Sequence, residues 1–235
     1  MFQLLILASI AGGMIPLGAL LARVENLHPV WLEEEFRHTV IAFGAGALLA
    51  AVAFVLIPDG AAAVPAWSAP LILIAGGAVM ALVDRLIGKS GGQAGQFIAM
   101  LADFLPEVIA LGALYTAGGG GSAVLLALLI GLQNLPEGFN AYRERVAAAP
   151  AAGKRVLISF CVLALIGPVG AILGYSTLAH DGATLGVMML FAAGAILYLM
   201  FQDIAPQVHL ERKFGPAIGA VAGMALGLAG DLMLG

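Results

Sequence analysis

Two similar stretches decide how this chain is interpreted: Asp103-Phe104-Leu105-Pro106-Glu107 and Gln133-Asn134-Leu135-Pro136-Glu137-Gly138. Each lies near the middle of a long apolar run, and in each a proline directly precedes a glutamate. Side chains four positions apart lie on one face of a helix. Ionisable residues deep in an apolar segment are costly and usually mark a functional site. Four oxygen-bearing side chains are therefore predicted to converge from two helices on a cation: Asp103, Glu107, Gln133 and Glu137.

The composition is that of a membrane protein. Of the 235 residues, 62% are hydrophobic and 10% charged, and the mean hydropathy is +1.05. The single cysteine excludes intramolecular disulfides and a cysteine-based metal cluster. The first twenty residues have no basic start, and their apolar run is too long for a signal peptide, so we expect a retained helix.

The apolar runs predict an all-α integral membrane protein that forms a single domain over residues 1–235. A membrane-spanning helix needs about 20 apolar residues. Eight runs meet or approach that length, at residues 3–22, 38–58, 69–87, 96–117, 122–142, 156–178, 184–206 and 215–234. Their abundant glycines permit close helix packing and favour a compact bundle.

The basic residues predict the orientation of the chain. Nine of the ten lysines and arginines fall in the odd-numbered loops between these runs, and the tenth, Arg85, lies at the end of the third run beside such a loop. The even loops, 59–68, 118–121 and 179–183, have none. Positive charge stays on the cytoplasmic side of a membrane. Both termini are therefore expected outside the cell membrane, which is the inner membrane if the cell has two.

A second repeat links the second and seventh runs. Residues 43–58 align without gaps with residues 191–206, and six of the sixteen positions are identical. The two runs cross the membrane in opposite directions under the predicted orientation. Helices 1–3 and 6–8 would then be inverted repeats around helices 4 and 5, an arrangement typical of secondary transporters. Chance similarity between Gly/Ala-rich segments is the alternative.

With these features the sequence resembles the ZIP (Zrt/Irt-like) family of divalent-metal transporters, as a divergent prokaryotic-type member. That family has eight helices, both termini outside, and a Pro-Glu turn in each central helix. The most specific match is residues 133–138, and Gly167-Pro168 is similar to the family's Glu-Pro pattern in helix 6. The resemblance implies that the four residues above occupy the family's principal metal site, and it suggests a homodimer.

The departures from the family pattern predict a site for one metal ion. The helix 4 histidine is Asp103 here, the following polar residue is Phe104, the helix 5 histidine is Gln133, and the helix 6 glutamate is Gly167. The changes to Phe104 and Gly167 remove ligands of the second metal that many relatives hold. Only Asn134 keeps a ligand atom there, as a weak ligand or a residue that supports the other ligands.

The predicted site offers only oxygen donors, three carboxylates and an amide. Such sets suit Mn²⁺, Mg²⁺ or Ca²⁺, whereas zinc commonly takes imidazole or thiolate. The resemblance implies Zn²⁺, Mn²⁺, Fe²⁺ or Cd²⁺ as substrate, with no permanently bound cofactor. Three close carboxylates cannot all stay charged without a metal, so metal binding is expected to release a proton.

Polar residues near the helix ends are candidates for an entrance and an exit. Asp59 is predicted at the outer end of the second run, and Gln202 and Asp203 near the inner end of the seventh. The alternative is that these side chains reach interfacial water without a role in transport.

The function that we predict is inward transport of divalent cations by a secondary transporter. A metal-binding membrane sensor and a proton-coupled cation exchanger are the alternatives. An intramembrane metalloenzyme is disfavoured, because His-Glu-x-x-His and Gly-x-Ser-x-Gly are absent, and no P-loop indicates ATP-driven pumping. We therefore expect no enzyme and no nucleic-acid partner, only the lipid bilayer and the metal.

Overall fold

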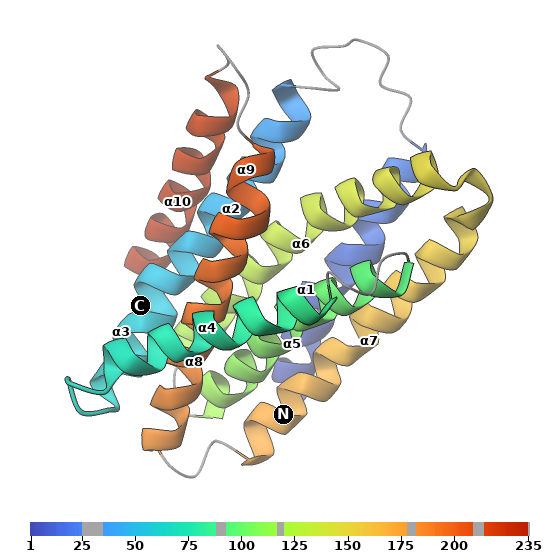
Figure 1. Cartoon of the computed structure of the whole chain (residues 1–235). Helices are drawn as coiled ribbons and strands as arrows, with labels where there is room; N and C mark the ends of the chain where they lie inside the picture. The colour runs from blue at the N-terminus through green and yellow to red at the C-terminus, as the bar shows by residue number, and fades with distance from the viewer. Residues whose placement is uncertain (25–34, 88–92, 117–119, 178–181, 209–213, 235) are drawn as a thin grey trace.

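The computed structural model describes residues 1–234 except 25–34, 88–92, 117–119, 178–181 and 209–213. Within these ranges all regular secondary structure is helical. Eight long helical rods contain the elements α1 (Phe2–Val24), α2 (Arg37–Ala50), α4 (Ala69–Ile87), α5 (Gln93–Thr116), α6 (Gly120–Ala148), α7 (Gly153–Thr177), α8 (Gly182–Leu199) and α10 (Gly215–Leu234). Figure 1 shows them as one bundle.

The predicted runs and the observed helices agree closely. Seven of the rods are long and apolar enough to cross a membrane, and the remaining one, α5, carries Asp103 and Glu107. The largest difference is at the end of α6, which continues six residues past the predicted end at 142, to Ala148. Prolines 106 and 136 lie inside continuous helices. The chain is a helical membrane protein, as predicted.

Two of the rods contain an unusual wide turn at matching positions. α2 continues through a π-helical segment, Ala51–Leu56, into α3 (Ile57–Ala62). α8 continues through a π-helical segment, Met200–Ile204, into α9 (Ala205–Gln207). In the alignment of residues 43–58 with 191–206, positions 51–56 correspond to 199–204, so the two segments nearly coincide. Chance similarity does not account for a shared local distortion that is rare in helices.

Close glycine contacts hold α2 against α10. A side chain on Gly46 would collide with the carbonyl oxygen of Ala220, and one on Gly223 with that of Phe43. Glycine is therefore required at both positions for the two backbones to approach so closely.

The same contact recurs between α8 and α4. A side chain on Gly194 would collide with the carbonyl oxygen of Leu73, and one on Gly76 with that of Phe191. In the alignment of the two runs, Gly194 corresponds to Gly46 and Phe191 corresponds to Phe43. The two pairs of helices thus pack in the same way, as the predicted repeat requires.

A further reciprocal pair of glycines occurs in the centre. Gly18 of α1 meets the carbonyl of Leu135 in α6, and Gly138 of α6 meets that of Ile15. Between α7 and α5 the contacts match: Gly174 meets the carbonyl of Ile109, and Gly112 meets that of Ala171. An exchange of α1 with α7, α2 with α8, α4 with α10 and α5 with α6 converts each main helix pairing into another main pairing or into itself. The packing therefore follows a two-fold pattern with α5 and α6 at its centre.

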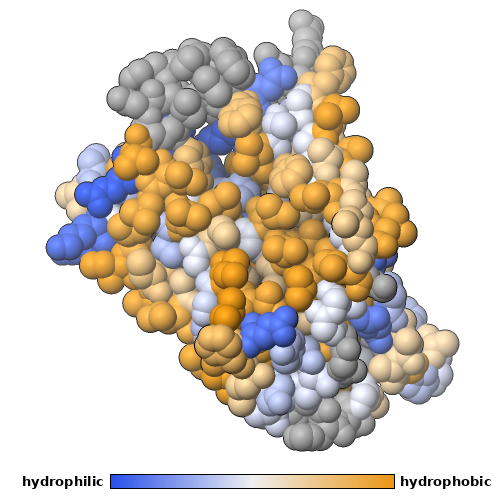
Figure 2. All heavy atoms as spheres, turned by 180° about the vertical axis from the view of Figure 1, so that it is seen from behind, coloured by the Kyte–Doolittle hydropathy of each residue, from blue (hydrophilic) through white to orange (hydrophobic). Residues whose placement is uncertain are grey.

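Hydrophobic residues cover most of the face shown in Figure 2. Exposed side chains such as Leu165, Val169, Ile218 and Val221 lie on the outward faces of α7 and α10. A surface of this kind suits contact with lipid tails and not with water. In the part of the chain that the structure describes, the buried polar side chains lie instead on α5 and α6.

Candidate metal centre

The predicted ligands lie where α5 and α6 meet inside the bundle. Glu107 is 1% exposed, Gln133 3% and Asp103 8%, and these are among the few buried polar side chains in the described part of the chain. Glu137 is partly buried. The structure therefore brings polar groups from both helices into an apolar interior.

Glu107 lies at the centre of this group. Asp103 and Glu137 are near enough for their charges to act on its carboxylate. Among the described residues, no group donates a hydrogen bond to either carboxylate oxygen of Glu107. A buried carboxylate without a donor is strongly unfavourable, so this group requires a cation or a proton.

Gln133 and Glu137 are joined along one face of α6. The side-chain amide nitrogen of Gln133 donates a hydrogen bond to Oε2 of Glu137. The amide oxygen of Gln133 is buried and has no hydrogen-bond donor in the described part of the chain. That oxygen and the two oxygens of Glu107 are acceptors that a metal ion could satisfy.

The carboxylates are neighbours without forming a closed ligand set. Within the described ranges, no group of three or more His, Cys, Asp or Glu side chains is arranged to hold a metal ion. The assignment of the four residues to one metal site therefore stays a prediction.

Asn134 is occupied by a structural contact. It is 1% exposed, and its amide nitrogen donates a 2.9 Å hydrogen bond to the carbonyl oxygen of Ala11 in α1. The bond ties α1 to α6 beside the candidate site. This contact supports the interpretation of Asn134 as a residue that positions others.

Phe104 fills the space beside Glu107 on the side of α1 and α7. Its side chain is 1% exposed. A methyl group built on Gly12 or on Gly167 would lie 3.0 Å from the tip of its ring. The large side chain on α5 is thus accommodated by glycines on the two neighbouring helices, and a ring stands where a polar residue was expected from the family pattern.

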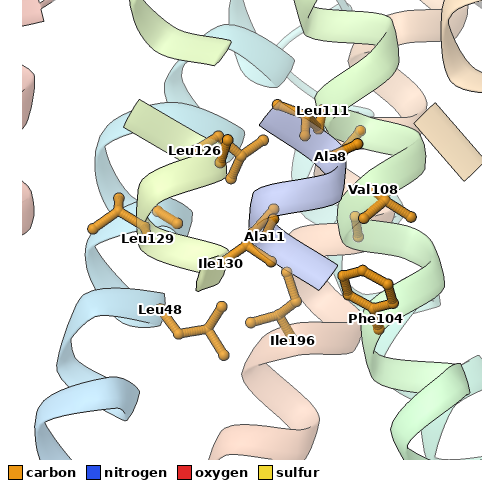
Figure 3. Close-up of a cluster of buried hydrophobic side chains, with 14 of the residues drawn as sticks. Ala8, Ala11, Leu48, Phe104, Val108, Leu111, Leu126, Leu129, Ile130 and Ile196 are labelled. Carbon is orange, nitrogen blue, oxygen red and sulfur yellow. The ribbon is translucent and has the colours of Figure 1, made fainter. Parts of the chain in front are cut away.

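Buried hydrophobic side chains precede the candidate site on α6. The residues of α6 that precede Gln133 include Leu126, Leu129 and Ile130, all buried. Figure 3 shows them in one cluster with Leu48 of α2 and Leu111 of α5. We call this group the apolar seal: Leu48, Leu111, Leu126, Leu129 and Ile130.

The candidate entrance and exit residues lie away from this centre. Asp59 in α3 is exposed, and its charge interacts with that of Asp231 in α10, a partner that the sequence analysis missed. Gln202 is exposed, and the side chain of Asp203 lies outside the described part of the structure. A role for these residues in transport stays a prediction.

Asn140 is a further buried polar residue that the sequence analysis overlooked. It is 9% exposed and lies on α6 beyond the predicted site. Its spacing of seven positions from Gln133 places it on the same helix face. That spacing was a signal in the sequence, because residue 140 lies inside the predicted run 122–142.

Comparison with known proteins supports the resemblance. No protein-family model matches the chain. A zinc transporter, GufA of Myxococcus xanthus, is 31% identical to it over 141 residues, 59% of this chain and 54% of the relative. The chain resembles a zinc transporter. This match confirms the predicted resemblance to ZIP-type transporters, and the chain spans about half the length of that relative.

Proposed function

We propose that this protein is a secondary transporter that moves divalent cations across the membrane into the cytoplasm. The ion binds between α5 and α6, where Glu107, Asp103, Gln133 and Glu137 supply oxygen ligands. The observation that carries this proposal is the fully buried carboxylate of Glu107, which has no hydrogen-bond donor in the described part of the chain. A divalent cation removes the cost of that buried charge.

The proposed ligands favour a hard or borderline cation. Carboxylate and amide oxygens suit Mn²⁺ and related ions, and Zn²⁺ also binds carboxylates. The matched relative is a zinc transporter. We therefore propose Zn²⁺, Mn²⁺, Fe²⁺ and Cd²⁺ as substrates, with no resident cofactor, and the closed geometry that each requires would form around the ion when it binds.

The packing of the bundle supports a moving structure. The paired helices meet through small residues, and their contacts follow a two-fold pattern centred on α5 and α6. In transporters built from inverted repeats, the substrate lies between the repeats and the halves move around it. The proposed site occupies that position.

The side from which an ion can reach the site depends on the residues that lie before and after it on α6. With both termini outside, the apolar seal lies on the outer side of Gln133, and Asn140 lies on the cytoplasmic side. We infer that these buried apolar side chains separate the site from the outer face of the membrane. Glycosylation or cysteine labelling at the chain termini tests the proposed orientation, and the mass of the protein in nanodiscs tests the homodimer.

A metal-binding membrane protein that does not move its ion is the second candidate. The observation in its favour is the replacement of two expected ligands by Phe104 and Gly167, which pack against each other. An ion-flux experiment separates the two functions. The purified chain is reconstituted into sealed vesicles, and saturable uptake of Zn²⁺, Mn²⁺, Fe²⁺ or Cd²⁺ is measured against empty vesicles. Binding without uptake would favour the second candidate.

A further inference from the structure

A line of polar side chains leads from the proposed metal site toward one end of α6. Its members are Gln133, Glu137, Asn140 and Glu144, and we call them the α6 polar stripe. Successive spacings of four, three and four place all of them on one face of the helix. The stripe is thus a row of oxygen-bearing side chains along one face of the helix.

The stripe runs from the interior to the surface. Gln133 is buried, Asn140 is 9% exposed, and Glu144 is exposed. α6 has 29 residues, a length of about 43 Å, whereas the hydrocarbon core of a bilayer is about 30 Å thick. The end of α6 that carries Glu144 therefore extends beyond the lipid tails on the predicted cytoplasmic side.

Arg37 lies across this stripe. It is the first residue of α2, and its NH1 group donates a 2.9 Å hydrogen bond to Oδ1 of Asn140, 103 positions away in sequence. The amide nitrogen of Asn140 in turn donates a 2.9 Å bond to Oε1 of Glu144. The only atom of Asn140 that could bind a cation is thus occupied by a guanidinium.

The guanidinium of Arg37 is held where its charge acts on the stripe. It is partly buried, and its Nε is buried without an acceptor among the described residues. Like charges repel strongly where little water screens them. A cation on the stripe beside Asn140 would therefore be repelled by Arg37.

We propose that Arg37 is the inner gate of a cation path along the α6 polar stripe. This inference rests on the proposed transport function. A cation that leaves the site toward Glu144 meets a like charge and competes with the guanidinium for Oδ1 of Asn140. Passage therefore requires the bond between Arg37 and Asn140 to break. Glu144 then takes the ion at the aqueous end.

The test compares the initial rate of Cd²⁺ uptake into vesicles for the wild type, Arg37→Gln and Arg37→Lys. Removing the charge in Arg37→Gln is expected to raise the rate roughly tenfold, the factor for one hydrogen bond to a charged group lost from the closed state. Arg37→Lys keeps the charge and should stay near the wild-type rate. The matched control is Arg155→Gln, which removes the charge of an exposed arginine at the start of α7 and should change nothing.

Equilibrium Cd²⁺ binding in detergent separates a gate from the binding site, because a gate variant should keep the wild-type affinity. An unchanged or lower rate in Arg37→Gln overturns the gate alone. A wild type that moves no metal overturns the transport function and the gate with it. If Arg37→Gln does not fold, Arg37→Met removes the charge and keeps most of the length of the side chain. Faster uptake by that variant supports the gate, and an unchanged or lower rate contradicts it.

Discussion

The side-chain amide of Gln133 donates a hydrogen bond to Oε2 of Glu137, one turn further along α6. This bond fixes the direction of a carboxylate that is only partly buried. It also leaves the amide oxygen of Gln133 without a donor in the described part of the chain. One residue thus orients a proposed ligand and offers a ligand atom of its own.

Replacing Gln133 with leucine is therefore expected to weaken metal binding without unfolding the chain. Loss of a residue that orients a ligand lowers metal affinity by about tenfold or more, and the loss of its own oxygen adds to this. Calorimetric titration with Zn²⁺ or Cd²⁺ measures the change. Gln3→Leu, at an exposed glutamine of α1, is the control. Equal affinity in the wild type and Gln133→Leu would remove this residue from the site.

Gly46→Ala is expected to destabilise the bundle. The added methyl group would collide with the carbonyl oxygen of Ala220, so α2 and α10 must separate. Overpacking of this kind costs about 1–3 kcal/mol. Gly13→Ala is the matched control, because a methyl group there meets no described atom within 4 Å beyond its own helix and chain neighbours. Thermal unfolding in detergent should show a lower midpoint for the first variant only.

Phe104→Ala should leave a cavity between α1, α5 and α7. Truncation of a buried phenylalanine costs about 3–5 kcal/mol, whereas Phe214→Ala, at a side chain that is 80% exposed, should cost little. The wild-type protein is expected to bind one metal ion per chain, because a ring fills the place of a second ligand set. A binding stoichiometry of two would contradict this account of Phe104.

Asn134→Leu is expected to act on stability more than on metal affinity. The variant removes the hydrogen bond from α6 to the carbonyl oxygen of Ala11 in α1. The loss of one buried hydrogen bond costs about 0.5–1.5 kcal/mol. A thermal unfolding midpoint well below that of the wild type, with a similar metal affinity, is the expected result. The reverse pattern would make Asn134 a direct ligand.

The fold was largely predictable because the lipid environment limits the choices. Spanning helices must be about 20 apolar residues long, so the length and spacing of the runs fixed most boundaries. α6 is the exception, since Arg143, Glu144 and Arg145 were interpreted as a loop and are helical. A helix can leave the membrane and continue into water, and hydropathy does not show where it ends.

The candidate site was predictable in its members but less so in its arrangement. In sequence, Pro136 and Pro106 are 30 positions apart, which aligns the two Leu-Pro-Glu stretches. In the two-fold packing pattern, Gly138 of α6 makes the same contact as Gly112 of α5, which lies 26 positions earlier. The structural repeat is thus shifted by about one helical turn from the sequence repeat, because helix packing depends on small residues and not on the polar ones.

Contacts between distant residues could not be predicted from one sequence. The bond between Arg37 and Asn140 and the proximity of Asp59 to Asp231 join residues on separate helices. Helical periodicity relates residues within a helix and gives no information about its partner. The contact of Phe104 with Gly12 and Gly167 has the same origin.

The central claim is that Glu107 binds the ion that the protein transports. The direct measurement is Zn²⁺ and Cd²⁺ uptake by sealed vesicles that contain the wild type, Glu107→Gln or Asp84→Asn. Asp84 is the control carboxylate, because it accepts a 2.9 Å hydrogen bond from Tyr198 away from the site. The account predicts saturable uptake by the wild type and Asp84→Asn and none by Glu107→Gln. Undiminished uptake by a folded Glu107→Gln variant would contradict it.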